Sequence, residues 1–102
     1  MDEFPDKQPY EEFYIGFNFF RRLLAGQTIA TITSVTVVDD ATPPVDVTDT
    51  LTRVELLEID GKQVNVWVRA GSTGHTYKLT CKIVTSGGQK HELEGTLAVV
   101  EI

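Results

Sequence analysis

Residues 70–95, AGSTGHTYKLTCKIVTSGGQKHELEG, carry the pattern that decides the fold. Between Tyr77 and Ile83 the odd positions are apolar and the even positions are polar, a period of two that indicates a strand with one buried face. The alternation returns in residues 91–102, and the glycine-containing segment 86–88 between them is typical of a three-residue hairpin loop. We therefore expect an antiparallel β-hairpin with its odd-numbered side chains in the core.

A three-residue loop pairs Thr85 with Gln89 and so fixes the register of the hairpin. The expected opposite pairs are Ile83 with His91, Cys81 with Leu93, Leu79 with Gly95, Tyr77 with Leu97 and His75 with Val99. In this register the two histidines are roughly 27 Å apart, at about 3.4 Å per residue. They are too far apart to share one zinc ion through bonds of about 2.1 Å.

The single cysteine, Cys81, alternates with core residues. A nucleophilic cysteine needs a positioned base and an exposed, electropositive setting, so we expect Cys81 to be a buried apolar residue and both histidines to lie at the rim. The chain also lacks a glycine-rich phosphate loop and a serine-centred elbow. The sequence predicts no catalytic, cofactor-binding or metal site, and thus a protein that is not an enzyme.

Length and charge narrow the function classes. With 102 residues, 41% of them apolar and 24% charged, the chain suits one globular domain with a modest core. A formal charge of −6 argues against nucleic acid as a partner, because such binding relies on Lys and Arg at phosphates. The apolar runs are too short to span a membrane, and the acidic N-terminus does not resemble a signal peptide, so we expect a cytoplasmic origin.

The first quarter of the chain is predicted to be an arm, a strand and a helix. Residues 1–9 contain two prolines and several charges without periodicity, which predicts a flexible N-terminal arm ahead of a single domain over 10–102. Phe13, Ile15 and Phe17 alternate as in a strand. Apolar residues then follow at helical spacing between Asn18, a suitable N-cap, and Gly26, a suitable C-terminal glycine, so one short helix is expected after the first strand.

The remaining pattern predicts an all-β fold. Residues 28–40 are rich in Thr, Val and Ile, 44–50 favour a short edge strand, and Asp60–Gly61 is typical of a hairpin turn. About seven strands favour a two-sheet antiparallel β-sandwich, with a small Greek-key barrel as the second choice. Gly74 and Tyr77 suit a tyrosine corner, which favours an immunoglobulin-like sandwich.

Seven of the nine aromatic residues fall within the first twenty positions. One interpretation is that they plug the open end of the sandwich. The other is that Phe4, Tyr10 and Tyr14 dock on another chain, since aromatic residues are favoured interface anchors. The last strand adds Val100 and Ile102 to an apolar second face that either the N-terminal segment or a partner must cover.

Carboxylates offer a weaker candidate site. Asp39, Asp40, Asp46 and Asp49 supply oxygen ligands of the kind that calcium prefers, although their spacing matches no EF-hand. A solvated acidic loop is the alternative. A stand-alone module that binds carbohydrate or calcium therefore stays open as a second function.

Two segments resemble a known family. NFFRRLLAGQTIATITSVTV (residues 18–37) and VWVRAGSTGHTYKLTCKIVTSGGQKHE (residues 66–92) are similar to motifs of small proteins from tailed phages and prophages, described as fibre–tail adaptor or head–tail structural proteins. The positions that match in place in the first segment are Phe19, Leu23, Gly26, Thr28 and Ile29. In the second segment the similarity lies in the tryptophan, the glycine turn before Tyr77 and the Thr-Ser-x-Gly loop.

The resemblance implies an immunoglobulin-like module without a catalytic centre. Its expected partners are other tail, fibre or head proteins of the particle, with a homo-oligomer as a further option. A protein of this kind is made in the bacterial cytoplasm and assembled into the virion.

Overall fold

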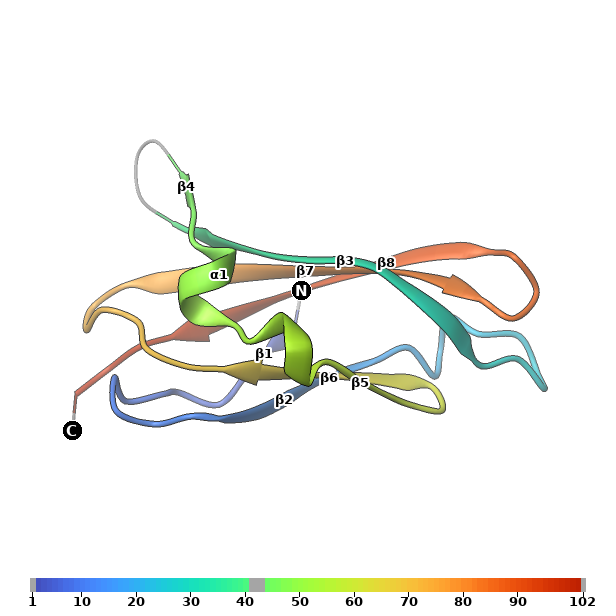
Figure 1. Ribbon diagram of the computed structural model, residues 1–102, viewed down its shortest axis with the longest axis horizontal. Helices are drawn as coiled ribbons and strands as arrows, with labels where there is room; N and C mark the ends of the chain where they lie inside the picture. Colours follow the sequence, from blue (N-terminus) through green and yellow to red (C-terminus); the bar gives the residue numbers. More distant parts are fainter. Residues whose placement is uncertain (1, 41–43, 102) are drawn as a thin grey trace.

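Two sheets pack face to face in the computed structural model, which describes residues 2–40 and 44–101. The larger sheet has the order β1-β8-β7-β3-β4 and the smaller the order β2-β6-β5 (Figure 1). The strands are β1 (Asp2–Glu3), β2 (Phe13–Asn18), β3 (Ile29–Asp39), β4 (Val45–Asp46), β5 (Glu58–Asp60), β6 (Gln63–Val68), β7 (Thr76–Thr85) and β8 (Lys90–Ala98). The predicted all-β sandwich is therefore confirmed at the level of two layers.

The β7–β8 hairpin has the register expected from its loop length. Ile83 pairs with His91 and Tyr77 with Leu97, and the two expected pairs between them, Cys81 with Leu93 and Leu79 with Gly95, also agree. Gly88 has a φ of +83° and donates its N–H to the Thr85 carbonyl at 2.9 Å, as the last residue of a three-residue loop requires. Loop length and alternation together fixed which side chains enter the core.

The core lies between the two sheets and consists of the alternating apolar residues of both. Val64, Val66 and Val68 on β6 are fully buried, as expected for one face of that strand. On β7 the odd-numbered side chains, Tyr77, Leu79, Cys81 and Ile83, are at most 2% exposed. Each large apolar side chain buried in this way contributes roughly 1.5–3 kcal/mol to folding.

The helix predicted between residues 18 and 26 is wrong. That segment makes two successive turns: Arg22 and Leu23 donate their N–H groups to the Phe19 carbonyl, and Gln27 donates its N–H to the Leu24 carbonyl. Phe19 still donates its own N–H to the Lys62 carbonyl at the end of the β2–β6 ladder, and the second turn, in which Gly26 has a φ of +82°, leads the chain back toward β3. The apolar spacing instead reflects two anchors, Phe19 and Leu23, that insert into the core.

Helical turns occur elsewhere, in the connection between β4 and β5. α1 (Thr48–Leu51) and a 3-10 helix, η1 (Val54–Leu56), carry the chain from the larger sheet to the smaller one. Leu51 is the residue of α1 that enters the core. This crossover was not expected from the sequence.

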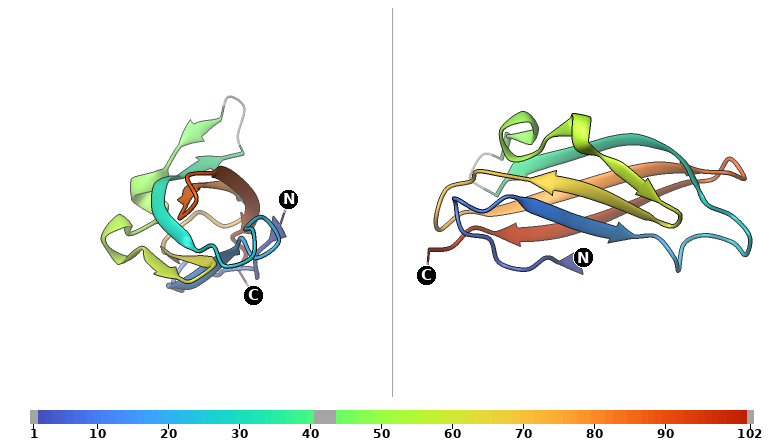
Figure 2. Two further views of the ribbon diagram at one scale, coloured as in Figure 1. Left: turned by 90° about the vertical axis from the view of Figure 1, so that its right-hand side faces the viewer. Right: turned by 60° about the horizontal axis from the view of Figure 1, so that its bottom comes forward.

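The segment expected to be an arm lies along β8. β1 pairs in parallel with Gly95 and Thr96, and Lys7 bridges to Val99. The Phe4 ring packs edge to face on Phe17 with their centroids 5.2 Å apart. Figure 2 shows this first segment beside the last strand, so both ends of the chain belong to the same side of the sandwich.

Candidate interaction surface

An open groove lies at the end of the sandwich where the chain turns into β2. It is lined by Pro9, Tyr10, Glu11, Glu12 and Phe13 from this turn and by Trp67, Arg69 and Ala70 from the end of β6. The two segments meet at one end of the long axis (Figure 2). The groove combines two carboxylates with aromatic rings, and aromatic residues are enriched in surfaces that bind another protein.

Lys7 ties the two walls of this groove together. Its side chain is buried, and its Nζ donates hydrogen bonds to the carbonyls of Gln8, Pro9 and Ala70. Burial lowers the pKa of Lys7, and the carboxylates of Glu11 and Glu12 act in the opposite direction. The lysine is therefore a structural clamp, because Pro9 belongs to one wall and Ala70 to the other.

The exposed aromatic side chains of the groove are held to different degrees. Tyr10 is 95% exposed, whereas Tyr14 packs edge to face on Trp67 at 5.0 Å and donates its hydroxyl to the Leu56 carbonyl. The Trp67 indole donates to Glu12 Oε1 at 3.0 Å. Tyr14 and Trp67 thus form a fixed platform, and Tyr10 projects beside it.

Other residues expected in an interface have different positions. Phe4 covers Gly95 and Phe17 inside its own chain. Val100 is half-buried and donates its N–H to the Lys7 carbonyl at 2.8 Å, and Ile102 lies outside the described residues. The N-terminal segment therefore covers part of the apolar second face of the last strand, which we expected either this segment or a partner to cover.

The opposite end of the molecule carries a surface that the sequence interpretation missed. In the loop between β2 and β3, Phe20 and Leu24 are 63% and 57% exposed. Lys62 places its Nζ 4.9 Å from the centre of the Phe20 ring. Arg21 and Arg22 lie between the two apolar residues, and the ion pairs of the described residues involve neither arginine. The predicted helix concealed this surface, because it assigned Phe20 and Leu24 to a buried face.

The titratable residues of the hairpin do not form a reactive site. Burial raises the pKa of the Cys81 thiol to about 12, so the thiolate needed for nucleophilic attack is absent at neutral pH. His75 pairs with Asp39 at 2.8 Å at one end of the hairpin, and His91 lies near the other. Within residues 2–40 and 44–101, no three His, Cys, Asp or Glu side chains gather as metal ligands would.

The acidic loop after β3 is partly outside the described residues, which omit 41–43. Asp46 accepts hydrogen bonds from the backbone N–H and the hydroxyl of Thr48, at 2.9 and 2.7 Å. These bonds, the backbone one first, lower the pKa of the Asp46 carboxyl. Through these two bonds Asp46 fixes the position of Thr48, the first residue of α1.

No helix in the described part of the chain has both the length and the apolar character to cross a membrane.

The fold and its surfaces define a class: a small all-β sandwich whose exposed aromatic and arginine side chains gather at its two ends. Comparison with known families is consistent with that class. Residues 7–98 match the family described as podophage GP4 fiber-tail adaptor protein gp77, so the chain belongs to this family. The resemblance to phage fibre–tail adaptors is confirmed. No curated protein matches the chain.

Proposed function

We propose that this chain is a non-enzymatic structural module of a phage or prophage particle. It joins tail, fibre or head components through protein–protein contacts, has an immunoglobulin-like sandwich as its scaffold, and passes from the bacterial cytoplasm into the virion. Membership of a fibre–tail adaptor family supports this proposal.

The observation that carries the mode of binding is Tyr10. A tyrosine that is 95% exposed beside a fixed Tyr14–Trp67 platform leaves a large apolar area in water. Tyrosine and tryptophan are enriched among the few residues that supply most of the binding energy of a protein interface. The proposal therefore rests on Tyr10 and Tyr14, whereas Phe4 serves the core.

Capture by neighbouring particle proteins tests this function. The wild-type chain is immobilised and incubated with purified tail, fibre and head–tail proteins of the same phage genome. We expect binding of at least one of them, and a loss of about tenfold or more for Tyr10→Ser. The matched control is Val54→Ser, which removes an apolar side chain of 52% exposure from η1, away from the groove.

Two results would argue against the proposal. The first is that the wild-type chain binds none of the particle proteins, although its Trp67 fluorescence shows that it is folded. The second is equal binding by the Tyr10→Ser and wild-type chains, which would remove the groove from the mechanism.

A further inference from the structure

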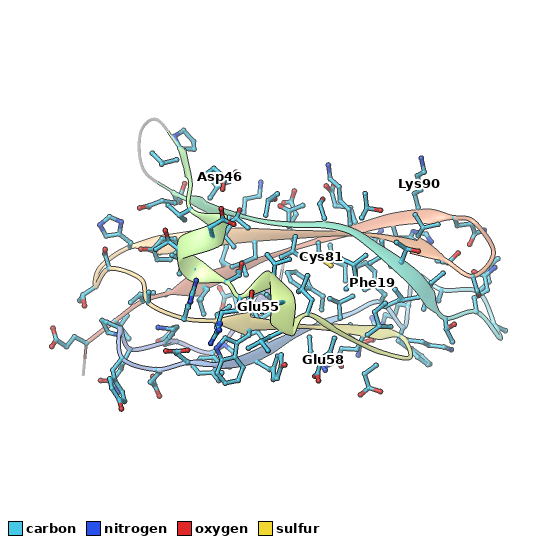
Figure 3. All side chains as sticks on the ribbon, in the orientation of Figure 1. Phe19, Asp46, Glu55, Glu58, Cys81 and Lys90 are labelled. Carbon is cyan, nitrogen blue, oxygen red and sulfur yellow. The ribbon has the colours of Figure 1, made fainter. Side chains whose placement is uncertain are left out.

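The two ends of the molecule are complementary in charge. At the end formed by the β2–β3 loop and the β5–β6 and β7–β8 turns, the cations are Arg21, Arg22, Lys62, Lys82 and Lys90, and the carboxylates are Asp60 and Glu92, the second of which pairs with Lys82. At the groove end, the carboxylates Glu11, Glu12, Asp39, Asp40, Asp46 and Glu101 outnumber the cations Lys7 and Arg69. Figure 3 shows Lys90 and Asp46 toward opposite ends of the long axis, which measures 42 Å.

The two ends are also complementary in shape and polarity. One end projects a loop with Phe20 and Leu24 largely in water. The other end is hollowed by the groove, whose aromatic wall includes Tyr10 and Trp67. The aromatic ring of the loop can pack against the rings of the groove. The arginines beside it can pair with the carboxylates of the groove or stack on its rings.

From these observations we infer that the groove of one copy binds the β2–β3 loop of a second copy. Phe20 enters beside Tyr10 and the Tyr14–Trp67 platform, and Arg21 and Arg22 meet the carboxylates of Glu11 and Glu12. The inference rests on the proposed function, because it names one partner of the same groove.

The hydrogen bonds of the groove are compatible with this contact. Glu12 accepts from Trp67 through Oε1, and Glu11 accepts from the Gln8 N–H through Oε1. A carboxylate has two oxygens, each with more than one lone pair, so both residues retain acceptors for an arginine. The cations near the groove are held by backbone carbonyls: Arg69 donates to Asp49 at 3.0 Å, and Lys7 donates to Gln8, Pro9 and Ala70.

Electrostatics selects the orientation of the two copies. Each chain has a formal charge of −6, so two copies repel one another in most orientations. Attraction requires the cationic end of one copy to face the acidic end of the next. This contact is head to tail: each copy binds one neighbour through its groove and a second neighbour through its β2–β3 loop. Such contacts build a ring or a filament.

Sedimentation velocity with two complementary variants tests the inference. Phe20→Ser with Arg21→Glu removes the loop surface, and Tyr10→Ser with Glu11→Lys removes the groove surface. We expect the wild-type chain to form dimers and larger species as its concentration rises. Each variant alone should dissociate at least about tenfold more readily. An equimolar mixture of the two should form dimers, because one intact loop and one intact groove remain.

A control and a salt series complete the experiment. Val54→Ser with Glu58→Lys makes an equivalent change on η1 and β5, between the two ends, and should associate like the wild type. Raising the salt from about 0.05 to 0.5 M should weaken association, because the attraction between the charged ends is then screened beyond a few ångströms.

Four results would overturn the inference: a wild-type chain that stays at the monomer mass, a single-surface variant that associates like the wild type, a mixture that stays monomeric, or association that salt leaves unchanged. If self-association fails while capture of tail proteins persists, the inference fails and the proposed function stands. If the chain self-associates but captures no particle protein, the proposed function fails.

Discussion

At the scale of single residues, Cys81 shows how burial removes chemistry from a side chain. Figure 3 shows its sulfur between the two sheets, and burial raises its pKa to about 12. We predict that a thiol reagent at neutral pH modifies the folded chain at least about a hundredfold more slowly than the chain in denaturant. With an aromatic disulfide as the reagent, the absorbance of the aromatic thiolate that it releases measures both rates. Equal rates would mean that Cys81 is accessible in the folded state.

A second residue, Tyr77, uses its hydroxyl to hold the turn before β7. The Ser72 N–H donates to Tyr77 Oη at 2.8 Å, beneath a turn in which Gly74 has a φ of +84°. Tyr77→Phe leaves this N–H without its acceptor, so the free energy of unfolding should fall by about 1–2 kcal/mol in urea titrations. Tyr14→Phe is the control, because its hydroxyl donates at an exposed site. A smaller loss for Tyr77→Phe than for Tyr14→Phe would contradict this role.

At the scale of elements, the pairing of β1 with β8 depends on a glycine. A Cβ at Gly95 would overlap the Phe4 ring, so Gly95→Ala should destabilise the fold by roughly 1–3 kcal/mol through overpacking. The same substitution in a Phe4→Ala background should cost clearly less, because the ring is gone. Urea unfolding of the wild type, the two single variants and the double variant gives the coupling energy between Phe4 and Gly95. Additive effects would show that Phe4 does not occupy the space above Gly95.

The elements that the sequence predicted correctly depend on local rules. The β7–β8 register follows from alternation and a three-residue loop, and the β5–β6 hairpin follows from Asp60–Gly61. The parallel pairing of β1 has no local signal, because two strand residues are too few for periodicity and their partners lie at the far end of the sequence. α1 has only four residues, and tertiary packing of Leu51 stabilises it more than helix propensity does.

The candidate surface was only partly predictable for the same reason. Aromatic density in the first twenty residues pointed to Tyr10 and Tyr14, both of which line or flank the groove. It did not separate them from Phe4, because burial of Phe4 depends on its position over Gly95. The sequence assigned no interface role to Trp67, because it lies between the polar residues Asn65 and Arg69 on the partly exposed face of β6.

At the scale of the whole molecule, we expect residues 2–8 to unfold together with the domain. They contribute β1, the Phe4 ring and the buried Lys7 clamp. Replacing this segment by a glycine–serine sequence of equal length should lower the free energy of unfolding by at least about 2 kcal/mol, since burial of one aromatic side chain alone is worth roughly that much. Urea unfolding followed by Trp67 fluorescence measures the loss. An unchanged midpoint would support the other interpretation, a flexible arm outside a domain that begins at residue 10.

The pairing of the first strand with the last also sets an order of events during synthesis. Gly95 and Thr96 are synthesised 93 residues after their partners Asp2 and Glu3. Contacts of such high sequence separation form slowly, because the entropy of closing the intervening chain must be overcome first. The edge of β8 therefore acquires its cover late in folding, and until then its unpaired backbone groups remain open to another chain.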